Sequence, residues 1–158
     1  NIGLITGPLS STVTKDRLKG YKNALKKNAI AINDTNITVG DYSISSGTLA
    51  ANDLFKNKTP PSAIFCMNDE MAIGAIQQAK KNGLNVPNDI SIAGFDDISF
   101  AEFCDPPLTT ISQPAEEFGT KAMSMLYDVI NGNEPENKNT YLPFELIIRD
   151  STGPNKRI

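Results

Sequence analysis

Histidine is absent from the 158-residue sequence, and cysteine occurs only twice. The missing imidazole removes the commonest general base and the commonest zinc ligand. Cys66 and Cys104 lie too far apart for a metal or redox motif, and two isolated thiols are typical of the reducing cytoplasm. The sequence therefore predicts a cytoplasmic protein with no catalytic residue, no metal site and no cofactor.

Long hydrophobic runs are also missing, since no stretch approaches the roughly 18 apolar residues of a membrane span. The net charge is −3, and the densest basic stretch, residues 15–27, is interpreted as the solvated face of a helix. We expect no membrane partner and no DNA binding by this segment itself. The first residue is not methionine and lies inside an expected strand, which indicates a piece of a longer protein.

Short apolar runs alternate with amphipathic stretches along the first two thirds of the chain. The strands are expected at residues 2–6, 38–42, 63–67 and 90–95, and the helices between them at residues 14–28, from a cap at Ser45 or Ser46 to 57, and from a cap at Asn68 to Gly83. Connections of this length require parallel strands. The pattern predicts an α/β fold, an open parallel sheet with helices on both faces.

The remainder of the chain has a different pattern. Residues 109–112 are expected to be extended, and a helix is expected over 115–131. The apolar stripe of this helix is too broad for one covering surface. Residues 141–149 are predicted to form a returning strand, followed by a polar tail over 151–158.

Polar and aromatic residues follow the expected strands. Parallel sheets bind ligands at the carboxyl ends of their strands, where this chain places Tyr42, Asn68, Asp96 and Asp97. With Arg17 as a forked donor, this set suits a sugar or a nucleoside. The alternatives are a helix cap for Asn68, turn formation for the two aspartates, ordinary packing for Tyr42 and a solvated side chain for Arg17.

At these positions the sequence resembles the lactose-repressor family of bacterial transcription regulators. The matching segments cover nearly the whole chain in one order: Gly-Pro-Leu-Ser-Ser at 7–11, Arg-Leu-Lys-Gly-Tyr at 17–21, Asn-Asp-Glu-Met-Ala-Ile-Gly-Ala at 68–75, Val-Pro at 86–87, Gly-Phe-Asp-Asp at 94–97, Pro-Pro-Leu-Thr-Thr-Ile at 106–111 and Glu-Leu-Ile-Ile-Arg at 145–149. Residues 78–81, 103–107 and 145–149 most resemble a branch of this family that senses a nucleoside.

The resemblance implies the C-terminal portion of an effector-binding core, with a fold shared with periplasmic sugar-binding proteins. Residues 1–112 would form the C-terminal subdomain, residues 113–141 would cross to the N-terminal subdomain, residues 142–150 would return, and residues 151–158 would form the tail. The DNA-reading helix-turn-helix is not in this chain. The broad stripe on the helix over 115–131 would then face a sheet that this chain lacks.

The resemblance also assigns roles to individual residues. Arg17 would donate to the effector, Tyr42 would stack on it, and Asn68 and Asp96 would hold its hydroxyl groups. Gln113 would lie at the hinge between the subdomains. A homodimer is implied as well, and the residues expected on the dimer face are Met71, Ile73 and Phe103.

The function predicted from these observations is effector sensing in a DNA-binding repressor, whose partners are a nucleoside or sugar and, through an N-terminal domain, operator DNA. Ligand binding would shift the equilibrium between two subdomain arrangements. Because the chain supplies one wall of the cleft, we expect weak binding or none by the chain alone. Two alternatives are a periplasmic sugar-binding transport protein and a Mg²⁺-dependent phosphotransfer enzyme using Asp96, Asp97 and Asp69.

Overall fold

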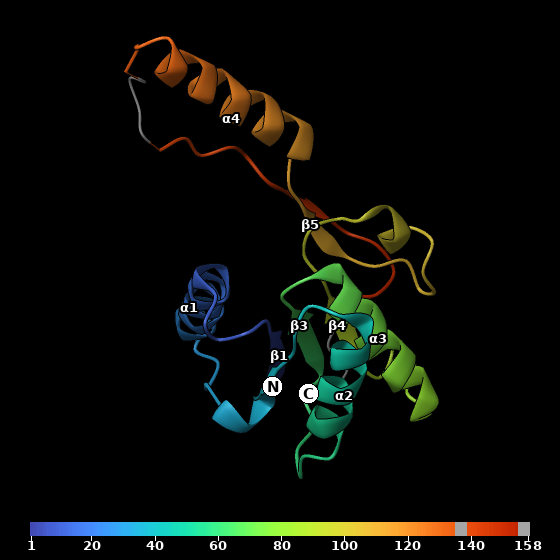
Figure 1. Cartoon of the computed structure of the whole chain (residues 1–158). Helices are drawn as coiled ribbons and strands as arrows, with labels where there is room; N and C mark the ends of the chain where they lie inside the picture. Colours follow the sequence, from blue (N-terminus) through green and yellow to red (C-terminus); the bar gives the residue numbers. More distant parts are fainter. Residues whose placement is uncertain (135–138, 155–158) are drawn as a thin grey trace.

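A four-stranded parallel sheet forms the centre of the protein (Figure 1). The computed structural model describes residues 1–134 and 139–154. The strands lie in the order β2-β1-β3-β4, and their bounds are β1 Ile2–Thr6, β2 Ile37–Val39, β3 Ala63–Cys66 and β4 Ser91–Ala93. In the register, Leu4 of β1 lies between Ile37 and Phe65. The predicted open parallel sheet is confirmed.

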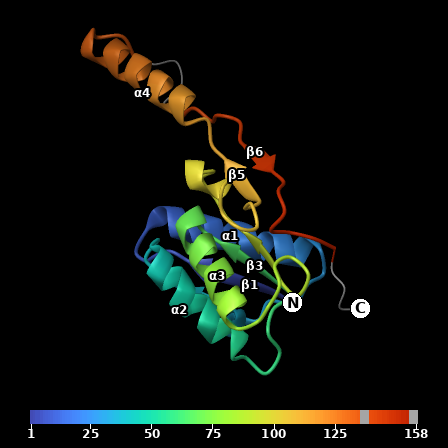
Figure 2. The same ribbon diagram turned by 90° about the vertical axis from the view of Figure 1, so that its right-hand side faces the viewer.

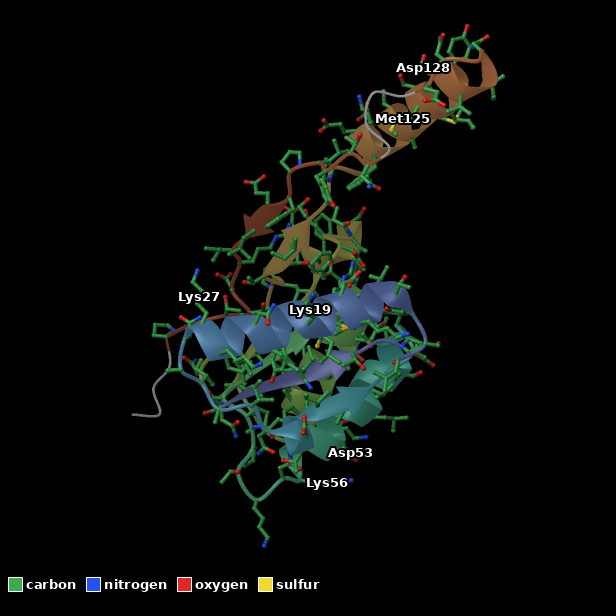
Figure 3. All side chains as sticks on the ribbon, turned by 90° about the vertical axis from the view of Figure 1, so that its left-hand side faces the viewer. Lys19, Lys27, Asp53, Lys56, Met125 and Asp128 are labelled. Carbon is green, nitrogen blue, oxygen red and sulfur yellow. The ribbon has the colours of Figure 1, made fainter. Side chains whose placement is uncertain are left out.

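Helices cover both faces of this sheet. Helix α1 (Thr12–Lys27) lies on one face, and α2 (Ile44–Phe55) and α3 (Asp69–Lys81) lie side by side on the other (Figures 1 and 2). The lysines of α1 point outward, as Lys19 and Lys27 show in Figure 3, which agrees with the predicted solvated face. Two short 3₁₀ turns, Asp34–Asn36 and Ser99–Ala101, complete the connections.

The core lies on both faces of the sheet, where Tyr21 and Leu25 of α1 are buried on one side and residues of α2 and α3 on the other. Leu4, Ile64 and Ile92, from three adjacent strands, are 0–1% exposed. Helices α2 and α3 touch through their backbones, because a Cβ atom added at Gly47 would lie 2.2 Å from the Met71 carbonyl oxygen. The lack of a side chain at Gly47 therefore allows the two helices to approach closely, and this contact fixes the position of α3.

A second, smaller sheet carries the chain away from the central one. Strand β5 (Thr110–Ser112) pairs antiparallel with β6 (Glu145–Ile147). Between them α4 (Ala115–Ile130) projects away from the rest of the protein (Figures 1 and 2). No residue of α4 is buried, and apolar side chains such as Leu126 and Ile130 are at least half exposed. The broad apolar stripe predicted for this helix thus has no partner among the described residues.

Several element bounds differ from the sequence-based expectations for local reasons. Strand β2 ends at Val39 because Tyr42 adopts a left-handed backbone conformation with φ 72°. The cap of α2 is Ser43, whose hydroxyl accepts from the Ser46 amide, so the expected cap at Ser45 or Ser46 is wrong. The returning strand is limited to Glu145–Ile147, which is shorter than the expected 141–149.

The predicted polar tail is wrong for its first residues. Ser151 is fully buried, and its amide donates to the Pro107 carbonyl oxygen at 3.0 Å. Its hydroxyl donates to the Ile92 carbonyl oxygen at 2.6 Å, and its own carbonyl oxygen accepts from the Ile92 amide at 2.8 Å. Residues 151–153 therefore lie along β4, while residues 155–158 lie outside the described part of the chain.

Two of the three residues expected on a dimer face belong to the core instead. Met71 is 0% exposed and Ile73 is 3% exposed, because α3 lies against α2 and the sheet. This corrects the expectation for both side chains. Phe103 is 75% exposed, so it remains available to a partner. No helix in the described ranges is both long and apolar enough to cross a membrane.

Candidate functional site

Arg17 lies over the carboxyl end of the central sheet. Helix α1 begins at its Ser11 cap, and its second turn directs the guanidinium group across β3. There it donates to the Met67 carbonyl oxygen, forms an ion pair with Asp96 at 3.4 Å and lies 3.8 Å from the centre of the Phe95 ring. The side chain is only 17% exposed. The alternative that Arg17 is a solvated surface residue is therefore wrong.

Asp96 joins Arg17 from the loop after β4. Its Oδ1 accepts from Arg17 and, at 2.7 Å, from the side-chain amide of Gln113. Burial raises the pKa of Asp96, while the charge of Arg17 and the hydrogen bonds from Gln113 and Arg17 act in the opposite direction. The backbone at Asp96 is left-handed, with φ 109°, so Asp96 does form a turn, as the alternative predicts. Its carboxylate also bonds Arg17 and Gln113, which turn formation does not require.

Asn68 connects two elements of the site. Its Oδ1 accepts from the Met71 amide at 3.1 Å and so caps α3, and its Nδ2 donates to the Tyr42 carbonyl oxygen at 2.9 Å. The helix-cap alternative is therefore confirmed. The side-chain amide of Asn68 retains one further N–H on Nδ2 and one lone pair on Oδ1, because each of these atoms makes only one hydrogen bond here. Capping and ligand contact are thus compatible at Asn68.

Tyr42 closes the same edge of the sheet. Its hydroxyl lies 2.7 Å from the hydroxyl of Thr14 in α1. Its ring occupies the space that a side chain at Gly7 would need, since an added Cβ would lie 2.0 Å from Tyr42 Cζ. Sequence reasoning missed Thr14, which is fully buried and has no motif around it. Thr14 and Gly7 together fix the orientation of the Tyr42 ring.

These side chains, Arg17, Tyr42, Asn68, Asp96 and Gln113, form what we call the polar rim. Beside it lies an open hollow of about 230 Å³, formed where the crossing strands leave the sheet. Its lining is mostly apolar and comprises Phe95, Ile111, Gln113, Pro114, Phe118, Leu142, Pro143 and Phe144. The structure thus brings all the sequence-predicted effector residues and the hinge residue to one region, next to a surface for an apolar group.

Asp69, the third carboxylate of the magnesium alternative, has a different role. It is 0% exposed and accepts from the Thr110 hydroxyl at 2.5 Å and from the Ile98 amide at 2.9 Å. Burial raises the pKa of Asp69, although both hydrogen bonds lower it. Asp97 is likewise occupied, by an ion pair with Arg149 at 2.8 Å. Within the described ranges no three acidic or cysteine side chains are placed to hold a metal ion.

Comparison with known proteins identifies the group to which this architecture belongs. The model of the periplasmic binding protein-like domain matches residues 1–152. The chain belongs to this family. The chain is also similar to named transcription regulators. The HTH-type transcriptional repressor CytR of Escherichia coli strain K12 is 44% identical over 151 residues, which are 96% of this chain and 44% of CytR.

A further relative and a solved structure are similar to this chain over nearly its whole length. The ribose operon repressor of Haemophilus influenzae is 38% identical over 150 residues, or 95% of this chain and 45% of that repressor. The solved structure of the lac repressor dimer bound to operator and the anti-inducer ONPF has a TM-score of 0.90 at 34% identity, covering 96% of this chain and 52% of that one. The resemblance to lactose-repressor regulators is confirmed.

The chain spans less than half the length of the curated relatives just described. These relatives are transcriptional repressors, which favours the regulator interpretation over the periplasmic transport protein and over the enzyme. CytR is among them, as expected from the segments that pointed to a nucleoside-sensing branch.

Proposed function

We propose that this chain is the effector-binding portion of a DNA-binding transcriptional repressor, and that its effector is a nucleoside or a small sugar bound at the polar rim. The observation that carries the proposal is the convergence of Arg17, Tyr42, Asn68 and Asp96 at the carboxyl end of the sheet. Four sequence-distant elements meet there, and side-chain hydrogen bonds hold them in place before any ligand binds.

The chemistry of the rim selects a polyhydroxylated ligand. The Asp96 carboxylate accepts hydrogen bonds from hydroxyl groups, and the Arg17 guanidinium, already paired with it at 3.4 Å, donates to the ligand. The mostly apolar hollow beside the rim, with Phe95 and Phe118, offers a surface to the face of a nucleobase. A nucleoside would therefore contact both the polar rim and the hollow, whereas a simple pentose would contact the polar rim alone.

Signal transmission follows from the two crossing strands. Strands β5 and β6 leave the central sheet together and lead to α4, whose apolar face is exposed. We propose that this face packs against a second lobe, and that a ligand between the lobes favours one of their relative arrangements. A ligand shifts such an equilibrium only by its difference in affinity for the two arrangements. In a homodimer in the cytoplasm, this shift would change the affinity for operator DNA.

The test is a calorimetric titration of the protein in its full natural length with cytidine, uridine and ribose. We expect micromolar binding of at least one probe, a change in operator affinity on its addition, and loss of about tenfold or more in effector affinity for Asp96→Asn, equivalent to about 1.4 kcal/mol. Asp105→Asn, at an exposed position outside the rim, serves as the control. Binding of no nucleoside or sugar, or unchanged binding by Asp96→Asn, contradicts the proposal.

The 158-residue chain provides a second measurement. We expect it to bind the same probe much more weakly than the full natural length, because it supplies one wall of the cleft. Equal affinities would show that the second lobe contributes nothing to binding, and would refute the two-lobe mechanism.

A further inference from the structure

Two adjacent carboxylates, Asp96 and Asp97, hold the two strands that cross out of the central sheet. Asp96 accepts from Gln113, the residue after β5, at 2.7 Å. Asp97 forms an ion pair with Arg149, two residues after β6, at 2.8 Å. Only the first of these contacts belongs to the polar rim. The second lies outside it and has no part in ligand binding as described above.

The turn that carries both carboxylates needs external support. The φ angles are 109° at Asp96 and 52° at Asp97, a region that side chains other than glycine rarely adopt. Such backbone conformations persist only where the surrounding structure holds them. The Asp96 amide is held by the Ile111 carbonyl oxygen at 2.9 Å. For the side chain of Asp97, the support is Arg149.

Arg149 is itself fixed at both ends. Its backbone amide donates to the Thr109 hydroxyl at 2.9 Å, and its carbonyl oxygen accepts from the same hydroxyl at 3.0 Å. One guanidinium nitrogen donates to the Leu108 carbonyl oxygen at 2.8 Å, and another bonds Asp97. Arg149 therefore joins the segment that follows β6, the residues directly before β5 and the Asp96–Asp97 turn at one point.

We propose that Asp97 and Arg149 are positioning residues for the effector site. Their ion pair holds the left-handed turn that directs the Asp96 carboxylate toward Arg17, and it ties the returning strand to that turn. The side chains are 21% and 18% exposed, so solvent screens the pair less than a surface ion pair. Effector affinity and the placement of the crossing strands therefore depend on the same contact. This inference rests on the proposed function.

The experiment compares Asp97→Asn, Arg149→Lys and the double variant in the protein of full natural length. Asparagine tolerates the left-handed backbone but removes the charge, and lysine keeps a charge but cannot bond Leu108 and Asp97 with a planar fork. With cytidine and ribose as calorimetric probes, we expect each single variant to bind about tenfold more weakly. The double variant should bind no more weakly than the weaker single variant, because both remove one contact.

The matched control is Asp53→Asn, which breaks the exposed Asp53–Lys56 pair at the end of α2 remote from β5 and β6 (Figure 3). It should leave probe affinity unchanged. Thermal unfolding is measured for every variant. A lower melting temperature with unchanged probe affinity, or additive losses in the double variant, overturns the positioning role. If the unaltered protein binds none of cytidine, uridine and ribose, the proposed function itself fails. If the unaltered protein binds a probe and Asp97→Asn binds it equally well, this inference alone fails.

Discussion

Replacing Gly74 with alanine tests how closely α3 lies against α2, and through that contact the position of Asn68. A Cβ atom at Gly74 would lie 2.1 Å from the Ile44 carbonyl oxygen and 2.8 Å from the Thr48 nitrogen. Both are backbone atoms, which cannot rotate away as a side-chain end can. Since non-bonded carbon contacts are favourable near 3.5–4.0 Å, the helices must separate by about 1 Å or more.

The expected loss of stability follows from two opposing effects. Alanine is favoured over glycine in a helix by about 1 kcal/mol, and overpacking of a well-packed contact costs about 1–3 kcal/mol. The net result is a decrease of up to about 2 kcal/mol in the free energy of unfolding. For a protein of this size that lowers the melting temperature by up to about 8 °C. Since α3 carries Asn68 at its first turn, effector affinity should also fall.

Gly20→Ala in α1 is the matched control. No atom lies within 4 Å of the added Cβ atom, so the helix preference acts alone and should raise the free energy of unfolding by about 0.5–1 kcal/mol. The assay is thermal and urea unfolding of both variants beside the unaltered chain. A Gly74→Ala protein as stable as the Gly20→Ala protein would refute the close approach of α2 and α3.

Three further predictions concern the site and its surroundings. Asn68→Ala should cost about 1 kcal/mol in urea unfolding, because it removes the cap of α3, whereas Asn68→Ser keeps a capping acceptor and should cost less. Both variants lose the hydrogen bond from Nδ2 to the Tyr42 carbonyl oxygen, so equal losses would argue against the cap. Burial raises the pKa of Asp69 above its ordinary value, so the folded state binds this proton more tightly than the unfolded state and loses stability as the pH rises through the raised pKa. The stability deficit of Asp69→Asn in urea unfolding should therefore be largest below about pH 4 and decrease toward neutral pH, and a deficit that grows with pH would contradict this sign. Leu126→Ser and Ile130→Ser, on the exposed face of α4, should change the free energy of unfolding of this chain by less than about 0.5 kcal/mol, and a larger loss would show that this face is covered within the chain.

Local patterns were sufficient for the central sheet and for the polar residues that follow its strands, whereas Gln113 was named only through the family resemblance. The run over 63–67 indicated a strand buried on both faces, and Asn68 directly after it indicated a cap, because both signals depend on neighbours in sequence. The general rule for parallel sheets then placed Asp96 at the carboxyl edge. Arg17, offered as an additional donor from the start of its helix and assigned to the effector by the resemblance, is found 3.4 Å from it. Residues 151–153 were missed, because a serine hydroxyl that bonds a distant strand leaves no periodic signal.

The sequence by itself determined the alternation of strands and helices, the parallel sheet and the residue types at its carboxyl edge, since these follow from hydrophobic period and chain connectivity. Only the tertiary structure decided which polar side chains pair. Asp69 accepts a hydrogen bond from Thr110, whereas Asp97 forms an ion pair with Arg149 and Asp96 forms one with Arg17. Three aspartates with similar local signals acquire different roles because burial and the partner across the fold, rather than adjacent residues, set the free energy of each carboxylate.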